Sequence, residues 1–343
     1  MDPLREPGDP TVLGGITLRG RLGEGGMGTV YYGITPDGDE VAVKTIQDRY
    51  ANRPELRRRF EREVEAMEMV QGPRVANLIA AAAPGEPVPW LAVEYIRGLT
   101  LTEHAAEHGT LPAQFAAALG VALADALASI HQAGILHRDL KPGNIILGRD
   151  GPRVIDFGLA ALADQPGQLT FSNDVLGTPA CMSPEQAVSS RDVTAATDVY
   201  ALGATLTFAT AGHYPFQGES GRETLSVIVD PAVEPDLSGV PAVLLPAVSG
   251  MLAWAAAARP TVAVAHAELV KVLADMGQTD PDAAVRRLAE ATFWESPGTP
   301  ERPRTVPPRP RLPDAAGEPR VPSTLVKRAA ERLRRDYAAS APF

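Results

Sequence analysis

The sequence is poor in cysteine and in uninterrupted apolar runs. One of its 343 residues is cysteine, Cys181, so no intramolecular disulfide can form, which fits a reducing cytosol. The amino terminus, MDPLREPGDP, has no apolar segment of the kind that a secretory signal contains. Residues 239–258 are uncharged over the length of a membrane span, but Pro241 and Pro246 interrupt them and favour a buried pair of helices. We therefore expect a cytoplasmic chain with no transmembrane segment.

Positive charge is also scarce over most of the chain. The formal net charge is −10, and residues from Ser296 onward carry ten Lys/Arg against five Asp/Glu, which leaves −15 for the residues before them. An acidic body argues against general nucleic-acid binding, so we expect no nucleic-acid partner. Hydrophobic residues make up 45% of the chain and charged residues 22%, which is typical of a soluble protein with a large core.

The order of the predicted elements divides the chain into a small β-rich part and a larger helical part. Residues 1–13 are rich in Pro, Gly and charge and are expected to be flexible. Short β-type runs follow, and Asp37-Gly38 between two of them is a strong hairpin signal. From about Thr100 the chain becomes mainly helical, beginning with a long apolar helix at 112–133 and with short strands near 145–147 and 154–155.

A helix is predicted at residues 54–70, between the β-type runs. Its apolar stripe consists of Phe60, Val64, Met67, Met69 and Val70.

A glycine-rich stretch, GRLGEGGMGTVYYG, occupies residues 20–33. The spacing of Gly23, Gly25 and Gly28 suits a loop wrapped around phosphates, and it occurs both in dinucleotide folds and in hairpin lids over ATP. A dinucleotide fold needs a helix directly after Gly28, whereas Thr29 to Tyr32 continue as a strand. The pattern therefore favours the ATP lid.

A cation is expected beyond such a lid, and VAVK places Lys44 there. Side chains alternate along a strand, so Ala42 and Lys44 point to the same side, where a small Ala leaves room for a flat ring. A carboxylate is needed to hold the lysine, and Glu63 of the predicted helix is the candidate. Taken alone, a helical glutamate is more often a solvated charge.

The densest group of chemically competent residues is ILHRDLKPGNIIL. Asp139 is flanked by Arg138 and Lys141, and Asn144 follows five residues later. This carboxylate can orient a hydroxyl and accept its proton, while Lys141 neutralises charge on a migrating phosphoryl group. Asp156 of IDFGLA lies beyond, and Asn and Asp oxygens suit Mg²⁺.

In combination these motifs resemble a Hanks-type (eukaryotic-like) bacterial Ser/Thr protein kinase of actinobacterial style over about residues 16–276. The resemblance implies an α+β, bilobal protein-kinase fold. A small β-rich N-lobe with one helix would precede a larger, mainly helical C-lobe and a flexible C-terminal tail. It also implies ATP and Mg²⁺, or Mn²⁺, as cofactors and proteins as substrates.

The resemblance assigns roles to individual residues. Lys44 would pair with the phosphates and with Glu63, Asp139 would be the catalytic base, and Lys141 would stabilise the γ-phosphate. Asn144 and Asp156 would hold the metal. The residues implied to contact the nucleotide are Leu22, Gly23, Glu24, Gly25, Gly26, Met27, Gly28, Val30, Ala42, Lys44, Val93, Glu94, Ile96 and Ile146.

Further motifs extend the resemblance into the second half of the chain. In GTPACMSPEQA, Thr178 would contact Asp139 and Lys141, and Glu185 would pair with Arg259 of ARPT. That pairing explains an arginine placed directly after the apolar run. In TDVYALG, Asp198 would brace the backbone around Arg138.

Arg138, directly before Asp139, is typical of kinases that are controlled by phosphorylation of the activation loop. Thr170 and Ser172 are the candidate acceptors for autophosphorylation, and the alternative is that they are ordinary polar loop residues. The competing function for the whole chain is a pseudokinase scaffold. That function predicts the loss of Lys44, Asp139 or Asp156, and all three are present.

The domain boundaries follow from these motifs and from composition. We expect a flexible N-terminus at 1–13 and a kinase domain at 14–276, with lobes 14–96 and 97–276. The remaining segments are an extra amphipathic helix within 277–295, a Pro-rich linker at 296–322 and a basic amphipathic tail at 323–343. The tail is interpreted as a plain linker with a weak helix, as a docking segment for a partner, or as a membrane-surface helix. Homodimerisation through the N-lobe is a further expectation.

Overall fold

The computed structural model describes residues 1–25, 28–46, 54–83, 85–157, 179–189 and 193–295, except for the side chains of residues 46, 54–56, 59 and 63. The predictions for Gly26, Met27, Thr170, Ser172 and Thr178 lie outside the described residues, as do those for the linker and tail.

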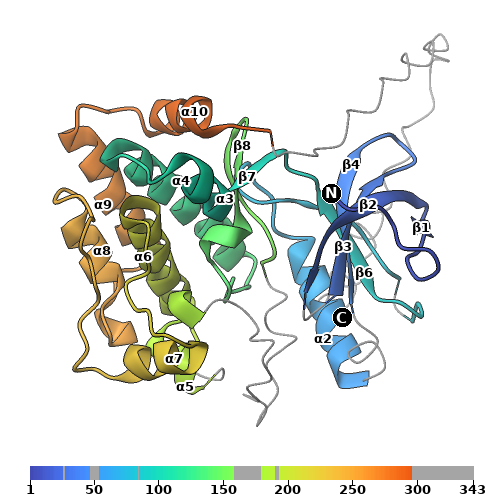
Figure 1. The fold of residues 1–343 in the computed structure, drawn as a ribbon, viewed down its shortest axis with the longest axis horizontal. Coiled ribbons are helices and arrows are strands. Elements are labelled where there is room, and N and C mark those ends of the chain that lie inside the picture. The colour runs from blue at the N-terminus through green and yellow to red at the C-terminus, as the bar shows by residue number, and fades with distance from the viewer. Residues whose placement is uncertain (26–27, 47–53, 84, 158–178, 190–192, 296–343) are drawn as a thin grey trace, which may run out of the picture. The chain divides into compact units, whose positions relative to one another are not determined.

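Six antiparallel strands form the first sheet, in the order β1-β2-β3-β4-β6-β5 (Figure 1). The strands are β1 (Val12–Leu13), β2 (Ile16–Gly25), β3 (Gly28–Ile34), β4 (Glu40–Ile46), β5 (Leu78–Ala81) and β6 (Trp90–Glu94). The predicted hairpin joins β3 to β4. Gly38 there has a φ of 94°, a value that glycine adopts at no steric cost, and its N–H donates to the carbonyl of Thr35.

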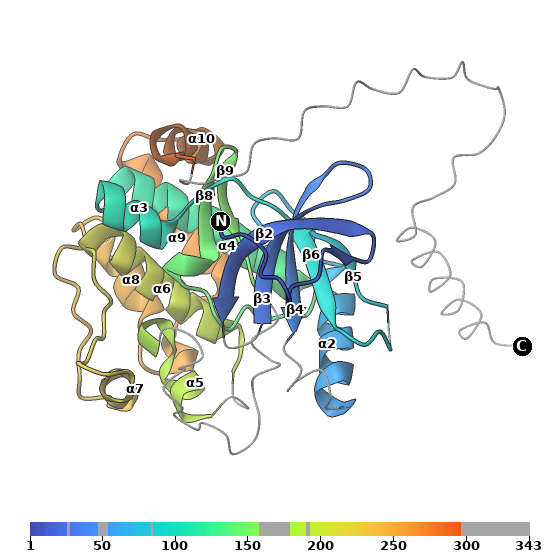
Figure 2. The ribbon, with the colours of Figure 1, turned by 45° about the vertical axis from the view of Figure 1, so that its right-hand side comes forward.

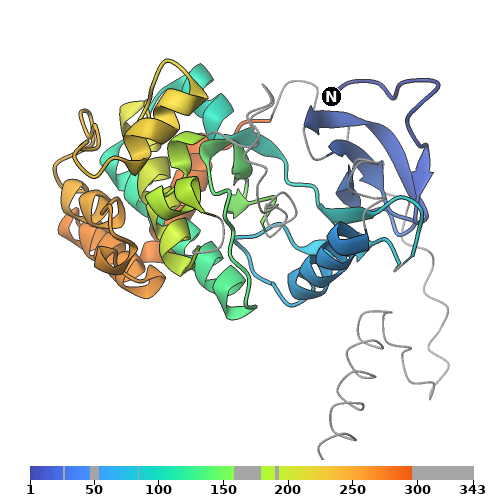
Figure 3. The same ribbon diagram turned by 90° about the horizontal axis from the view of Figure 1, so that it is seen from below.

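The two faces of this sheet meet different surroundings. Val41 and Val43 of β4 are fully buried in a cluster with Ile16, Tyr31 and Trp90 on one face. Because side chains alternate along a strand, Ala42 and Lys44 point to the other face. Figures 1 and 3 place helix α2 (Pro54–Met67) on the side of the sheet that faces the helical part of the molecule.

Three of the predicted stripe residues of α2 form the buried face of that helix. Phe60, Val64 and Met67 are buried, and Val70 follows them into the same core. Met69 was wrongly assigned to the stripe, since 60% of its surface is exposed. The helix has already ended there, and two turn residues follow Met67, so the helical period no longer sets the direction of the side chain.

The amino terminus differs from the flexible segment that its composition predicted. Val12 and Leu13 pair with Thr17 and Ile16, and Asp2 forms an antiparallel bridge with Arg21 on β2. Asp9 accepts a hydrogen bond from the Tyr31 hydroxyl at 2.8 Å. Polar contacts, which leave no periodic signal in a sequence, hold this segment on the sheet.

The second part of the fold begins with a three-stranded antiparallel sheet, β7-β8-β9. Its strands are β7 (Gly98–Thr100), β8 (Ile145–Gly148) and β9 (Gly151–Val154). The helices of this part are α3 (Leu101–His108), α4 (Ala113–Gln132), α5 (Pro184–Val188), α6 (Ala195–Ala211), α7 (Gly221–Val229), α8 (Leu245–Met251), α9 (Val262–Asp275) and α10 (Pro281–Thr292), and its 3-10 turns are η1 (Pro142–Asn144), η3 (Pro179–Cys181) and η4 (Ala256–Ala258). Of these helices, α3, α4 and α10 contact the sheet. The predicted strand near 154–155 begins earlier, at Gly151, and ends before Ile155.

Helices α4 and α6 form the centre of the helical core. Thr194 caps the start of α6 through its side chain, and Gly212 ends the helix at a left-handed φ of 79°. Within the described residues, α4 has the length and composition of a membrane span, but 67% of its apolar window is buried inside the fold.

The structure departs from the prediction for one helical region and agrees with it for another. The apolar stretch at 239–258 contains one short helix, α8, and the 3-10 turn η4, rather than a pair of helices, because prolines and glycine divide it. The helix predicted within 277–295 is α10, which contacts α4, β8 and β9 (Figure 2). Val285, Leu288 and Ala289 are buried, while Phe293 follows the helix as its C-terminal cap residue and is half-buried.

Candidate active site

Strand β4 carries the lysine that reaches across to the second part of the fold. The Lys44 Nζ lies 3.0 Å from Oδ2 of Asp156, and only 12% of the lysine side chain is exposed. The expected partner, Glu63, is on α2, and its side chain lies outside the described residues. In this structure Lys44 therefore joins β4 to the segment that follows β9.

Several residues predicted to contact the nucleotide are cross-strand neighbours around this lysine. Val30 pairs with Lys44 between β3 and β4, and Ala42 pairs with Val93 between β4 and β6. Directly opposite residues in antiparallel strands have their Cβ atoms about 4.5–5.5 Å apart. The register therefore brings these side chains into one patch on the sheet, although they span 63 positions in the sequence.

The glycine-rich stretch is the end of the β2–β3 hairpin. Gly23 pairs with Val30, Glu24 with Thr29, and Gly25 with Gly28. A Cβ placed on Gly23 or Gly25 meets no heavy atom of the described residues within 4 Å. Glycine here leaves the backbone open to a close approach from outside the protein. Leu22 precedes this open stretch on β2.

The connection between the two parts of the fold runs from β6 to β7. Glu94 ends β6, and its carboxylate accepts hydrogen bonds from Asn77 Nδ2 at 3.0 Å and Arg153 Nη2 at 2.7 Å. Arg153 also donates to the carbonyl of Pro73 at 2.7 Å. The sequence analysis did not predict these contacts of Glu94, because neither Asn77 nor Arg153 belongs to a recognisable motif. Ile96 lies in the connection itself, and Ile146 on β8 pairs with Thr100 on β7.

The segment between α4 and β8 gathers the polar groups that its motif predicted. The Oδ2 atom of Asp139 lies 2.8 Å from Lys141 Nζ and 3.0 Å from Asn144 Nδ2. Asn144 Nδ2 also donates to the backbone carbonyl of Asp139 at 2.8 Å. The three side chains therefore hold one another in a fixed arrangement beside Asp156.

Two residues of this region adopt left-handed backbone conformations. Arg138 has a φ of 63° and Asp156 a φ of 59°. A non-glycine residue in this conformation costs on the order of 1–2 kcal/mol, so the surroundings must hold it there. For Arg138 the support is Asp198, whose side chain is fully buried.

Asp198 accepts from two consecutive backbone N–H groups. The His137 N–H donates to Oδ2 at 2.9 Å, and the Arg138 N–H donates to Oδ1 at 2.8 Å. His131 Nε2 lies 2.7 Å from Oδ2, and Gln186 donates to the Arg138 carbonyl at 2.6 Å. The bracing expected of Asp198 is thus present. His131 and Gln186 add to it, and sequence reasoning assigned neither of them.

His137 is a buried part of the same support. Burial lowers the pKa of its imidazole, which favours the neutral ring. The backbone N–H of Asp139 donates to Nδ1 at 3.3 Å, a contact that a neutral ring accepts. Three consecutive backbone N–H groups, those of His137, Arg138 and Asp139, are therefore held by side chains that are fully buried.

Another ion pair secures the region that follows the undescribed residues 158–178. Arg259 donates to both carboxylate oxygens of Glu185, at 2.7 and 2.8 Å, and Thr197 donates to the same carboxylate at 2.8 Å. Burial alone would raise the pKa of Glu185, but the contacts with Arg259 outweigh it and lower the pKa to about 2. The guanidinium of Arg259 also lies 4.9 Å from the ring of Tyr200.

The donor set near Asp139 fits a hard divalent cation. Asn144 uses its amide nitrogen for Asp139, which directs its amide oxygen elsewhere, and Asp156 contributes a carboxylate. The described residues hold no group of three or more His, Cys, Asp or Glu arranged as a closed metal site. Magnesium commonly binds through one or two protein oxygens together with substrate phosphates, so this donor set is compatible with it.

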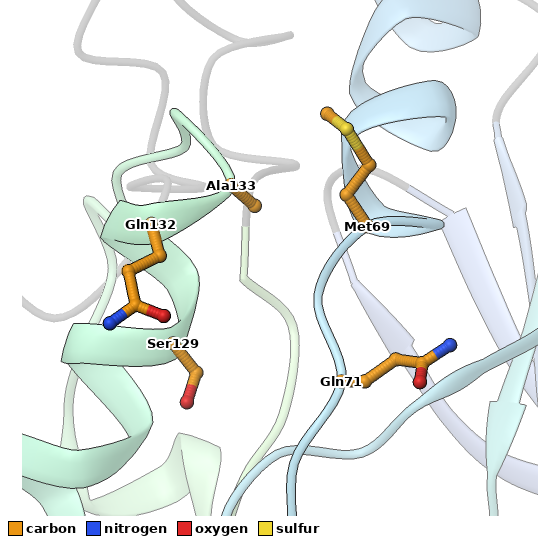
Figure 4. A pocket seen from close by; sticks show the side chains of 5 residues that line it. All are labelled: Met69, Gln71, Ser129, Gln132 and Ala133. Carbon is orange, nitrogen blue, oxygen red and sulfur yellow. The ribbon is translucent and has the colours of Figure 1, made fainter. Parts of the chain in front are cut away.

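A separate hollow of about 260 Å³ lies between the end of α2 and the end of α4 (Figure 4). Its lining residues are Met69, Gln71, Ser129, Gln132 and Ala133. None of the predicted site residues is among them, so this hollow is distinct from the candidate active site.

Comparison with known proteins places the chain among bacterial relatives. A family model described as "Protein kinase domain" matches residues 16–271. The chain is 43% identical over 282 residues to the serine/threonine-protein kinase AfsK of Streptomyces coelicolor, which covers 82% of this chain and 35% of AfsK. It is 45% identical over 234 residues to the probable serine/threonine-protein kinase PkwA of Thermomonospora curvata, covering 68% of this chain and 31% of PkwA. The chain thus spans about a third of the length of these relatives.

A solved structure agrees with this placement. The crystal structure of the Mycobacterium tuberculosis PknI kinase domain superposes with a TM-score of 0.60 at 28% identity, covering 76% of this chain and 97% of that one. The β-sheet lobe and the helical lobe of the predicted fold are therefore both present. On the strength of the family model and of these relatives, the chain belongs to the protein kinase family, in its Hanks-type bacterial serine/threonine branch.

Proposed function

We propose that this chain is a serine/threonine protein kinase that transfers the γ-phosphoryl group of ATP to serine or threonine hydroxyls of proteins (EC 2.7.11.1). The observation that carries the proposal is the arrangement around Asp139. Lys141 and Asn144 contact one oxygen of this carboxylate, and Lys44 from the other lobe reaches Asp156 nearby. These are the residue types that phosphoryl transfer uses, in the order and spacing of the family.

The geometry suggests that the two carboxylate oxygens of Asp139 have different roles. Both of its side-chain contacts are to Oδ2, so we assign Oδ1 to the substrate hydroxyl. The hydroxyl oxygen forms a bond to the γ-phosphorus, the bond from that phosphorus to the β–γ bridging oxygen breaks, ADP leaves, and the hydroxyl proton passes to Oδ1. Lys141 adds positive charge beside the transferred group, and Lys44 does so for the phosphates nearer the nucleoside.

The metal and nucleotide roles rest on the same residues. Asn144 and Asp156 would hold Mg²⁺, or Mn²⁺ in its place, and the ion would neutralise charge on the phosphate oxygens. The patch formed by Val30, Ala42 and Val93 would receive the adenine ring. The backbone of Glu94 and Ile96 would hydrogen-bond the adenine ring, with Ile146 below it.

Substitution of the two charged residues tests the proposal. Asp139→Asn keeps the shape but removes the proton acceptor, and we expect kcat to fall about 10²- to 10⁴-fold. Lys44→Ala should reduce kcat/KM by a comparable factor. The assay is transfer of labelled phosphate from ATP to generic protein substrates, with Asp37→Asn in the exposed β3–β4 turn as the control. Equal inactivity of the wild type and both variants would favour the pseudokinase scaffold instead.

Regulation, partners and location are part of the proposal. Arg138 precedes Asp139, and a phosphate on Thr170 or Ser172 would be its counter-charge, with Thr178 contacting Asp139 and Lys141. Mass spectrometry after incubation with Mg·ATP checks this, and a phosphate-free 170–172 segment would contradict it.

We further propose a cytoplasmic location, an N-lobe homodimer and a tail that docks a partner. The single cysteine supports the cytoplasmic location. The contrast between the basic tail and the acidic remainder of the chain supports docking by the tail.

A further inference from the structure

The segment before the family-matched residues contacts the strand that leads into the glycine-rich hairpin. The Asp9 carboxylate lies 2.9 Å from Arg21 Nε, and its other oxygen accepts from the Tyr31 hydroxyl at 2.8 Å. The side chains of Asp9 and Arg21 are only 4% and 9% exposed. Asp9 precedes residue 16, where the protein kinase match begins. We call Asp9, Arg21, Tyr31 and Glu24 the Asp9 anchor.

Arg21 extends this contact to the glycine-rich residues themselves. Its Nη1 lies 2.9 Å from Oε2 of Glu24, which stands between Gly23 and Gly25. The Arg5 guanidinium lies 3.2 Å from the same oxygen. The backbone of Arg21 is fixed as well, since it exchanges hydrogen bonds of 2.8 and 2.9 Å with Asp2.

Glu24 is the one side chain through which residues 23–25 can be held. A Cβ on either neighbouring glycine would meet no heavy atom of the described residues within 4 Å, so no side-chain packing adds to the backbone pairing of this stretch with β3. Strands without side-chain packing are weakly held in position. The ion pair with Arg21 supplies the contact that the glycines cannot.

The environment of Asp9 supports a persistent contact. Burial acts to raise the pKa of its carboxyl, but hydrogen bonds from the Arg5 backbone and the Tyr31 hydroxyl, together with Arg21, outweigh it and leave the pKa below its usual value. The carboxylate is therefore charged at neutral pH and matches the permanent charge of Arg21.

We propose that Asp9 is a positioning residue for the phosphates of ATP, acting through Arg21 and Glu24 on the backbone of Gly23 and Gly25. The inference rests on the proposed function, because it assigns that hairpin to the nucleotide phosphates. It adds residues from outside the kinase match to the ATP site. Loss of the Asp9 anchor leaves the adenine-binding patch unchanged and weakens only the interactions of the phosphates.

The test compares the affinities for ATP and for adenosine, which lacks phosphates. By calorimetry with Mg²⁺ present, Asp9→Asn should raise the dissociation constant of ATP about threefold to tenfold and leave that of adenosine within about twofold. Asp37→Asn removes the same charge from the exposed β3–β4 turn and should change neither. Equal weakening of both ligands, or of neither, overturns the inference, because the first outcome indicates a general disturbance of the lobe.

A second variant keeps the inference testable if Asp9→Asn folds poorly. Glu24→Gln changes a half-exposed side chain and should raise the dissociation constant of ATP in the same selective way. In the double variant the two effects should not add, because both break one chain of contacts through Arg21. Additive effects would overturn the inference. A wild-type protein that binds no ATP would instead end the proposed function, whereas normal wild-type binding with unaffected variants ends only this inference.

Discussion

The two sides of the candidate active site are held by different means. On the helical side, Asp139 stands on backbone that the fully buried Asp198 fixes through two N–H groups. On the sheet side, a Cβ added to Gly23 or Gly25 would meet no heavy atom of the described residues within 4 Å, and the half-exposed Glu24 supplies the side-chain contact of a stretch that otherwise pairs with β3 through its backbone. The group proposed to accept the proton is therefore fixed in advance, while the stretch proposed to meet the phosphates keeps room to adjust to them.

The largest expected effect comes from removing the buried support on the helical side. Asp198→Ala leaves two buried N–H donors without an acceptor and releases Arg138 from its left-handed conformation. We expect the free energy of unfolding to fall by about 3–5 kcal/mol and kcat to fall at least about 100-fold. Denaturant titration and steady-state kinetics measure these, with Asp275→Ala at the exposed end of α9 as the control. Near-normal activity would show that the hydrogen bonds from Asp198 are dispensable, and the two sides of the site would then no longer differ in how firmly they are held.

A medium effect is expected at Glu185, also on the helical side, and it depends on pH. The pKa of Glu185 is about 2 in the folded protein against an ordinary value of 4.5, so folding favours the charged form. The resulting stability is present above pH 4.5 and is lost as the pH falls towards 2. At pH 7 it amounts to at most about 3–4 kcal/mol, since each unit of pKa is worth about 1.4 kcal/mol.

The measurement compares the wild type with Glu185→Gln by denaturant unfolding at several pH values. The difference in unfolding free energy should be largest at pH 7 and should shrink below pH 4.5. Glu219→Gln on the exposed surface serves as the control. A difference that stays constant between pH 7 and pH 3 would mean that the charge of Glu185 contributes little.

The smallest effect on stability is expected on the sheet side. Gly23→Ala places a methyl group in open space, and the alanine restricts the unfolded chain, so the unfolding free energy should change by less than about 1 kcal/mol. The methyl group would nevertheless occupy the space offered to phosphates, so the KM for ATP should rise about threefold to tenfold. Thermal unfolding and initial-rate kinetics separate the two quantities. A large loss of stability would show that this stretch is packed after all.

The helical side was the easier of the two to predict from sequence. Asp139, Lys141 and Asn144 lie within six consecutive residues, and their order and spacing are enough to indicate their chemistry. The pairing of Glu185 with Arg259 was predicted from the resemblance to the kinase family, and it explains an arginine placed directly after an apolar run. Buried charges are generally paired or bind metals.

The sheet side held contacts that no sequence pattern revealed. Asp9 meets Tyr31 across 22 positions, and Arg153 meets Glu94 across 59. Neither contact has a period or a motif, because a single polar contact fixes two residues and leaves their neighbours unconstrained. Residues 1–13 were predicted to be flexible because their composition does not show such isolated contacts. Met69 was misplaced because the sequence did not show where α2 ends.

The lone cysteine described at the end of η3 makes this chain suitable for thiol-directed labelling. Burial raises the pKa of Cys181 to about 12, and its side chain is almost inaccessible. Because the thiolate is the reactive species, maleimides and spin labels should pass over Cys181 at neutral pH. Cysteines introduced at Asp37 and at exposed Val188 would then carry the only probes on the folded protein, and the distance between the lobes could be followed as nucleotide is added.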